Sequence, residues 1–210
     1  MRKSVPILGA LLALALVACA QTPPPAPAPA ADVPTTLRGT VQSLNGQALV
    51  VATREGPKAT VMLAADTNYR RVLAKHFSDI KVGDFVGATT VTGKDGKPHA
   101  VELHIFTAAQ SAVPKSQRPW DLRPDSTMTN AIVSGIAKAP GGAHVLTVTF
   151  GDKSFALIVD RNTPVVTYGP GDVKLVYKGR HVLIMALKKP DDTLIARNVT
   201  VEYHGVKPPM

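Results

Sequence analysis

An internal repeat constrains the fold of this chain more than any other feature of its sequence. The copies share their turns, since Asn45-Gly46 and Gly141-Gly142 are both dipeptides typical of tight β-hairpins. A repeat of this kind predicts two copies of one structural unit. A shift of 96 positions (135 minus 39) aligns these identical residues without a gap: Gly39 with Gly135, Gly46 with Gly142, Thr53 with Thr149, Thr67 with Thr163, Gly83 with Gly179, Val86 with Val182, Asp95 with Asp191 and Ala100 with Ala196.

Each copy is predicted to contain short β-strands. Alternating apolar and polar residues and many β-branched side chains indicate strands. Between the third and fourth strands, Val72, Leu73 and Phe77 have helical spacing, so 69–81 predicts a helix-like segment, whereas 163–178 predicts a loop. The predicted strands are 37–44, 48–54, 59–65, 85–92 and 100–106 in the first copy, and 133–139, 144–149, 154–159, 181–187 and 194–202 in the second.

Three strands, a connecting segment and two further strands form the order of the five-stranded OB barrel. We therefore predict an all-β fold with two tandem OB-like five-stranded barrels. The first OB-like repeat covers residues 37–107, a Trp-containing connector covers 108–128, and the second repeat with the C-terminal tail covers 129–210. One continuous β-sandwich is the alternative.

The start of the chain predicts a bacterial lipoprotein signal at residues 1–18. Basic residues precede an apolar stretch, and small residues lead to Cys19, the only cysteine, as in a lipobox. We predict lipidation of Cys19, followed by a Pro/Ala-rich tether over 19–36 in extended polyproline II conformation. An ordinary secretory signal cleaved nearby is the alternative. The prediction places the protein in the cell envelope, lipid-anchored at the outer membrane and facing the periplasm.

The composition limits the partners of such a protein. The formal net charge of +9 favours attraction to anionic surfaces. In the envelope, these are anionic lipids or polymers. We therefore predict the membrane that holds the anchor, an envelope protein or an anionic polymer as partners, and we expect no nucleic acid partner.

No motif assigns a catalytic, cofactor-binding or metal-binding residue. The histidines have none of the spacings of zinc motifs, and no serine lies in a nucleophile elbow. Glu102 and His104 lie two apart and share one strand face, which we expect to be exposed because Leu103 faces the core. Met62 and Met185 lie in apolar strands, so we expect them in the cores rather than around a soft metal ion.

The connector carries the only tryptophan of the chain, Trp120, with Arg118 and Arg123 nearby. A tryptophan flanked by arginines is typical of an interface hot spot or a sugar-stacking platform. The interpretation that we favour is a side chain that fills the seam between two barrels and fixes their angle. Trp120, Arg118 and Arg123 are therefore the possible interface residues.

Four segments, which include the connector tryptophan, resemble a family of bacterial envelope proteins: 80–84, 118–122, 126–131 and 205–210. This family is uncharacterised, carries OB-like β-barrel repeats of unknown function, and is often labelled automatically as metal ABC transporter permease. The resemblance implies the barrel fold but no activity. A permease also requires a set of membrane helices, which the sequence after the signal does not contain.

From these observations we predict a non-enzymatic, envelope-anchored lipoprotein that acts as a binding or assembly module without a cofactor. The alternative function is a periplasmic metal-binding carrier or sensor, because of the family label and the His and Met residues. An enzyme would require a deep polar pocket in which titratable groups converge.

Overall fold

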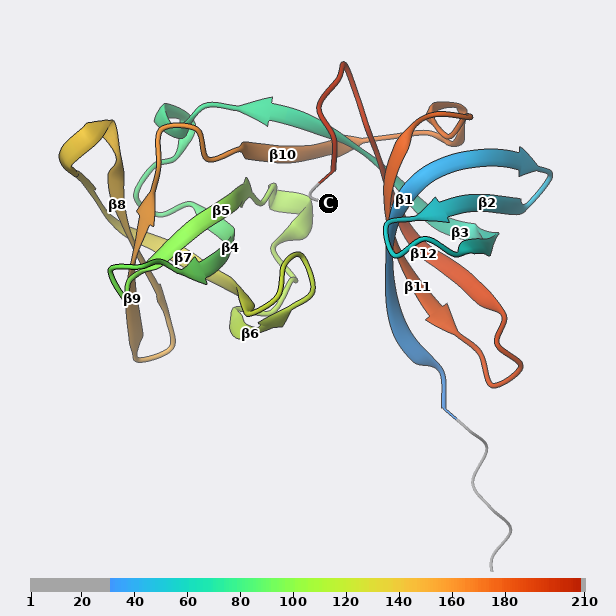
Figure 1. The fold of residues 1–210 in the computed structure, drawn as a ribbon, viewed down its shortest axis with the longest axis horizontal. Coiled ribbons are helices and arrows are strands. Elements are labelled where there is room, and N and C mark those ends of the chain that lie inside the picture. The colour runs from blue at the N-terminus through green and yellow to red at the C-terminus, as the bar shows by residue number, and fades with distance from the viewer. Residues whose placement is uncertain (1–30, 209–210) are drawn as a thin grey trace, which may run out of the picture. The chain divides into compact units, whose positions relative to one another are not determined.

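A computed structural model describes residues 31–208, and within this range the fold is all-β, as predicted (Figure 1). The signal peptide, Cys19 and most of the tether lie outside the described residues. No helix within residues 31–208 has the length and apolar character needed to cross a membrane. The strands are β1 (Val33–Asn45), β2 (Ala48–Thr53), β3 (Lys58–Lys75), β4 (Phe85–Thr92), β5 (Pro98–Ile105), β6 (Ser116–Trp120), β7 (Ser126–Lys138), β8 (His144–Phe150), β9 (Lys153–Val159), β10 (Val165–Pro170), β11 (His181–Lys188) and β12 (Leu194–Val201).

One closed barrel, here called the terminal barrel, combines both ends of the described chain. Strands β1, β2 and β3 pair antiparallel in sequence order, and β1 also pairs antiparallel with β11. Strand β12 pairs antiparallel with β11 and parallel with β3, which closes the ring. Figure 1 shows this as blue and red strands in one barrel. Its core is formed by inward-facing residues of all five strands, such as Val41, Leu49, Val61, Ile184 and Val199.

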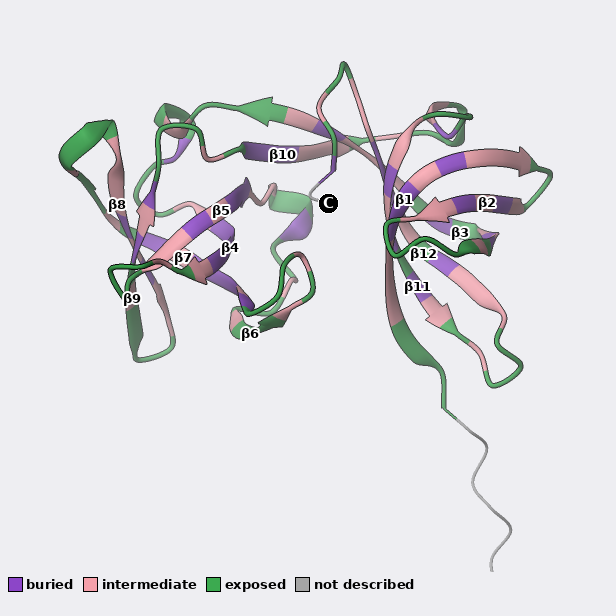
Figure 2. Cartoon of the chain, in the orientation of Figure 1, coloured by how far each residue is buried: buried purple, intermediate pink, exposed green. Residues whose placement is uncertain are grey.

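The second barrel, here called the central barrel, uses the strands between these ends. Strand β4 pairs antiparallel with β5 and β7, and β7, β8 and β9 follow in antiparallel order. The ring closes where His99 of β5 lies opposite Ile158 of β9 in parallel orientation. Its core includes Leu103, Leu146 and Leu157. In Figure 2 the buried stretches lie along the strands of both barrels, while the hairpin tips are exposed.

The two barrels exchange strands, which differs from the expectation that 37–107 and 129–210 each form a barrel. The first three strands of each repeat form a closed barrel with the last two strands of the other repeat. The cause is the segment after the third strand, because β3 continues to Lys75 and pairs antiparallel with β10 instead of turning back. In this pairing Val72 lies opposite Tyr168, its own repeat equivalent (168 minus 72 is 96). The exchange therefore has an approximate two-fold symmetry.

Several local features differ from the expectations. The predicted helix-like segment 69–81 is the end of β3 followed by a 3₁₀ turn at Phe77–Asp79, and the predicted loop 163–178 contains β10. These two segments pair with each other, which satisfies their backbone hydrogen bonds. Local patterns do not reveal this pairing, because the two segments are distant in sequence. The last tether residues, from Val33, belong to β1, where they pair with β11. The connector contains β6, which pairs with β7.

A histidine at the closing pair of the central barrel lies within hydrogen-bond distance of two carboxylates. His99 lies 3.3 Å from Asp160 (Nδ1 to Oδ2) and 3.1 Å from Asp95 (Nε2 to Oδ1). The hydrogen bond with Asp160 raises the pKa of His99, partial burial opposes this, and Asp95 raises the pKa further. A pKa above that of the unfolded chain means that the charged form stabilises the fold.

We therefore expect the stabilisation by His99 to be complete below about pH 6.5 and to disappear as the pH rises through the elevated pKa. Urea unfolding at about pH 5.5 and about pH 8.5 measures this, with a lower midpoint expected at the higher pH. His99→Gln should flatten this dependence. An equal pH dependence in the variant would show that His99 is not responsible.

Candidate functional site

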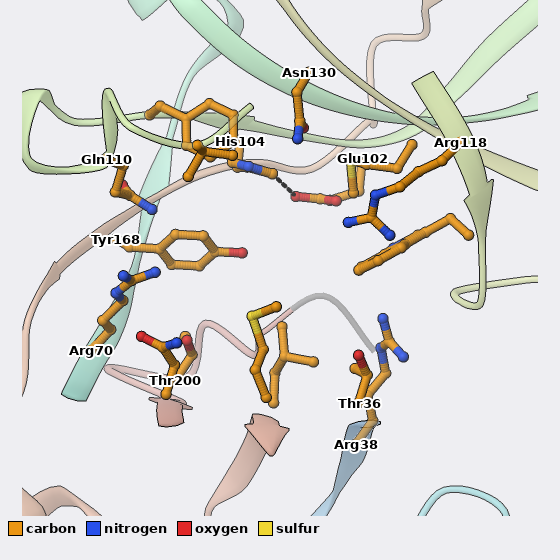
Figure 3. A pocket seen from close by; sticks show the side chains of 17 residues that line it. Thr36, Arg38, Arg70, Glu102, His104, Gln110, Arg118, Asn130, Tyr168 and Thr200 are labelled. Carbon is orange, nitrogen blue, oxygen red and sulfur yellow. Dashed lines mark ion pairs between the residues drawn. The ribbon is translucent and has the colours of Figure 1, made fainter. Parts of the chain in front are cut away.

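A pocket of about 150 Å³ lies between the outward faces of the two barrels, and we call it the interbarrel pocket (Figure 3). Side chains alternate across a strand, so the neighbours of core residues point outward into this space. Both barrels and the segments between them contribute to its walls. The lining residues are Thr36, Arg38, Arg70, Glu102, His104, Phe106, Gln110, Val113, Arg118, Trp120, Met128, Asn130, Tyr168, Leu183, Met185, Asn198 and Thr200.

Glu102 and His104 share one face of β5, as predicted, but the expectation that this face is exposed was wrong. Leu103 between them is buried in the core, and the side chains of Glu102 and His104 are only 6% and 9% exposed. The connector and Tyr168 of β10 cover this outer face of the barrel, since both contribute to the same pocket. The burial thus results from a second layer that strand alternation alone does not predict.

Several buried polar atoms of this pocket have no hydrogen-bond partner in the described protein. The Glu102 carboxylate accepts a hydrogen bond at Oε2 from Thr89 Oγ1 (3.3 Å), and its Oε1 lies 3.5 Å from His104 Nδ1. That distance is too long for a hydrogen bond. Within residues 31–208, Glu102 Oε1, His104 Nδ1 and Asn130 Oδ1 are buried without a hydrogen-bond partner, although Glu102 and His104 are close enough for an ion pair, drawn as a dashed line in Figure 3. Buried polar groups are normally hydrogen-bonded, so three exceptions in one pocket need an explanation.

The neighbouring strand makes room for the His104 ring. Gly87 lies opposite His104 in the antiparallel pair of β4 and β5. A Cβ atom at Gly87 would overlap the imidazole ring. The other side of the ring meets Phe106 edge-on, with 4.3 Å between centroids. The ring is thus held between a glycine and an aromatic side chain.

Tyr168 provides a neutral hydroxyl in the same pocket. Burial raises the pKa of this hydroxyl, and the negative charge of Glu102 raises it further, while Arg70 acts in the opposite direction. The phenol therefore stays protonated at neutral pH and can donate a hydrogen bond. In Figure 3 its hydroxyl points into the pocket, and Arg70 lies beside Tyr168, away from Glu102.

Trp120 lies at the wall of the pocket, where it joins the connector to the terminal barrel. Its ring is half-buried and faces two guanidinium groups, those of Arg118 at 4.4 Å and Arg38 at 5.3 Å from the ring centroid. Arg38 is 2% exposed and donates a hydrogen bond to Asp121 (2.7 Å). The structure thus brings Trp120 and Arg118 together in one pocket, whereas Arg123 lies outside its lining.

Neither Met62 nor Met185 belongs to a barrel core, contrary to the expectation. Met62 is only partly buried in β3, where its neighbours Val61 and Leu63 face the core of the terminal barrel. The expectation that Met185 belongs to a core was wrong, because its side chain is 46% exposed and lines the interbarrel pocket together with Met128. No group of three or more His, Cys, Asp or Glu side chains within residues 31–208 is arranged to hold a metal ion.

The repeat contains a signal that locates this pocket. Glu102 and His104 are equivalent to Asn198 and Thr200 under the shift of 96 (198 minus 102), and all four side chains line the pocket. Polar residues at equivalent outward positions of both copies indicate a shared polar space. The chemistry differs between the copies, since β5 contributes a carboxylate and an imidazole where β12 contributes an amide and a hydroxyl. No family model, no curated protein and no solved structure matches this chain.

Proposed function

We propose that this chain is a non-enzymatic binding protein of the cell envelope and that the interbarrel pocket holds its ligand. The unpaired buried atoms of Glu102, His104 and Asn130 are the observation that supports this most. An unsatisfied buried polar group costs about 1 to 3 kcal/mol. A ligand that hydrogen-bonds to these atoms offsets this cost, and preformed pockets with a few convergent polar groups are typical of small-molecule sites.

The envelope location belongs to the same proposal and depends on Cys19. We infer lipidation of this thiol from the lipobox and membership of the envelope family from the four similar segments. Labelling with radioactive palmitate followed by membrane fractionation tests the anchor. The wild-type protein should carry label in the membrane fraction, and Cys19→Ser should lose both. A Cys19→Ser protein that stays fully membrane-bound would contradict the anchor.

Native mass spectrometry of the protein released from its own membrane tests the pocket. Met185 is exposed at the pocket, so Met185→Trp should obstruct it without filling a core. We expect the wild type to carry a small molecule that Met185→Trp lacks. Val82→Trp is the matched control, because Val82 is also an exposed apolar residue, outside the lining of the pocket, and it should keep the molecule. The proposal would be contradicted if all three proteins carried the same amount of bound small molecule, or if the wild type carried none.

A second candidate function is acid-base catalysis in the same pocket. Glu102 lies beside the His104 imidazole, and the neutral Tyr168 hydroxyl can donate a hydrogen bond to a negative charge that develops on a substrate, so titratable groups converge there. Prolonged incubation of the bound compound with the protein, followed by NMR spectroscopy, separates the two functions. A binding protein returns the compound unchanged. Conversion that is lost in His104→Asn would instead establish an enzyme.

A further inference from the structure

The unpaired atoms of the interbarrel pocket select the chemistry of its ligand. Glu102 Oε1 and Asn130 Oδ1 are acceptors, and both lie in side chains that are more than nine-tenths buried. A buried carboxylate is costly without a charged or strongly donating partner. The nearest titratable group, the His104 imidazole, lies 3.5 Å from Glu102 Oε1, within ion-pair distance but beyond hydrogen-bond distance, and Arg118 stacks on Trp120 without an ion pair to Glu102 in the described residues. A ligand ammonium group supplies both the positive charge and several donors.

The opposite side of the pocket has the reverse charge. Arg70 of β3 lines the pocket beside Tyr168 and forms no ion pair with a carboxylate of the described residues. Arg38 differs from it, because its charge is opposed by Asp121 at 2.7 Å. A guanidinium group and a neutral phenol hydroxyl together form a donor site for an anionic oxygen. Figure 3 shows Arg70 and Glu102 on different sides of the pocket.

Between these polar ends the pocket wall is apolar, with Met128, Leu183 and Met185 among its lining residues. A volume of about 150 Å³ accommodates a molecule on the order of six to eight heavy atoms. This is enough for two charged groups and a short branched alkyl chain.

We propose that the ligand is a small zwitterion of amino acid size, whose ammonium group binds Glu102 and Asn130 and whose anionic group binds Arg70. This inference rests on the proposed function of the pocket. It explains why unlike charges lie at separate places around one small apolar space.

Isothermal titration calorimetry with three compounds of matched shape tests the inference. L-Valine carries both charged groups, isobutylamine lacks the carboxylate, and isovalerate lacks the ammonium group. We expect L-valine to bind at least about tenfold more tightly than either of the other two, because each charge-assisted contact contributes. Equal affinity for L-valine and isovalerate, or for L-valine and isobutylamine, would overturn the zwitterion.

Two variants assign the two charged contacts. Glu102→Gln should weaken the binding of L-valine and isobutylamine at least about tenfold and leave the affinity for isovalerate unchanged. Arg70→Met should weaken the binding of L-valine and isovalerate and leave the affinity for isobutylamine unchanged. Glu202→Gln is the matched control, since Glu202 also pairs with a histidine, His181 at 2.6 Å, outside the pocket. Uniform losses for all three compounds would overturn the assignment. If circular dichroism shows that a variant does not fold, the affinities of the wild-type protein for the three compounds test the inference without that variant.

The outcomes separate this inference from the proposed function. If none of the three compounds binds but the wild type carries a molecule that Met185→Trp lacks, the pocket binds a ligand of another class and the zwitterion is rejected. If the wild type carries no molecule and binds none of the three compounds, both proposals are rejected.

Discussion

Replacing Ile184 with alanine is expected to loosen strands that lie more than a hundred residues earlier in the chain. Ile184 of β11 is fully buried in the terminal barrel, opposite Leu37 of β1 and Val199 of β12. Removing a buried isoleucine side chain costs about 2 to 5 kcal/mol. Because β11 completes the barrel of β1, β2 and β3, we expect faster amide exchange in β2 (Ala48–Thr53).

The reciprocal variant controls this prediction. Leu103 of β5 is fully buried in the central barrel, so Leu103→Ala should cost a similar amount and accelerate exchange most in β8 (His144–Phe150). Hydrogen exchange read by mass spectrometry resolves local openings of this kind. If each repeat closed its own barrel, the pattern of faster exchange would be reversed. Ile184→Ala would then accelerate exchange in β8, and Leu103→Ala would accelerate it in β2. That reversed pattern would contradict the exchange of strands.

Gly39→Ala is expected to destabilise the protein by about 2 to 3 kcal/mol, because overpacking a well-filled barrel forces backbone and side chains apart. A Cβ atom at this position would overlap the carbonyl oxygen of Ala52 and approach Val51 Cγ1 to 2.7 Å. The backbone oxygen belongs to the paired strand β2 and cannot move independently. The glycine is therefore required by close approach of two strands.

The second copy of the repeat supplies the control for this substitution. Gly135 is the equivalent of Gly39, but a Cβ atom there would lie 3.5 Å from Thr147 Cβ, an ordinary contact. Gly135→Ala should therefore be neutral or slightly stabilising. Urea unfolding of both variants against the wild type gives the two free energies. Equal losses would show that the two copies pack alike at this position, contrary to the structure.

The strand order was predictable from sequence because it depends on local patterns. Alternating residues and hairpin dipeptides identified the five strands of each copy, and the order matched an OB barrel. The exchange of strands was not predictable from these patterns. Both copies carry equivalent strands, so a barrel closed by β4 and β5 and one closed by β11 and β12 satisfy the same alternation. The choice depends on whether 69–75 continues as a strand, which requires its distant partner β10.

The candidate site was predictable only in part, for a related reason. Alternation placed Glu102 and His104 on the outward face of a strand, and the arginine-flanked Trp120 was identified as a possible interface residue. The burial of that face depends on the connector, on β10 and on the outer face of the terminal barrel. These contacts join positions that no local pattern relates. Tyr168 and Arg70 were missed because they lie in segments predicted as loop and helix.

Disulfide trapping tests the central claim, the exchange of strands between the two repeats, most directly. In a Cys19→Ser background, a cysteine pair at Thr36 and Met185 lies on directly opposite residues of β1 and β11. Opposite residues of antiparallel strands have Cα separations compatible with a disulfide. Two competing pairs would form if each repeat closed its own barrel. Thr36 with Thr89 keeps the register of β1 with β11, because Thr89 is the repeat equivalent of Met185 (185 minus 89 is 96). Thr36 with Phe85 keeps the register of β7 with β4, where Ile132, the repeat equivalent of Thr36, lies opposite Phe85.

Mild oxidation followed by peptide mapping of the monomer gives the answer. We expect the Thr36→Cys/Met185→Cys protein to form an intramolecular disulfide, and the Thr36→Cys/Thr89→Cys and Thr36→Cys/Phe85→Cys proteins to remain reduced. A disulfide between positions 36 and 89 or between positions 36 and 85, with positions 36 and 185 still reduced, would show that each repeat closes its own barrel and would contradict the exchange.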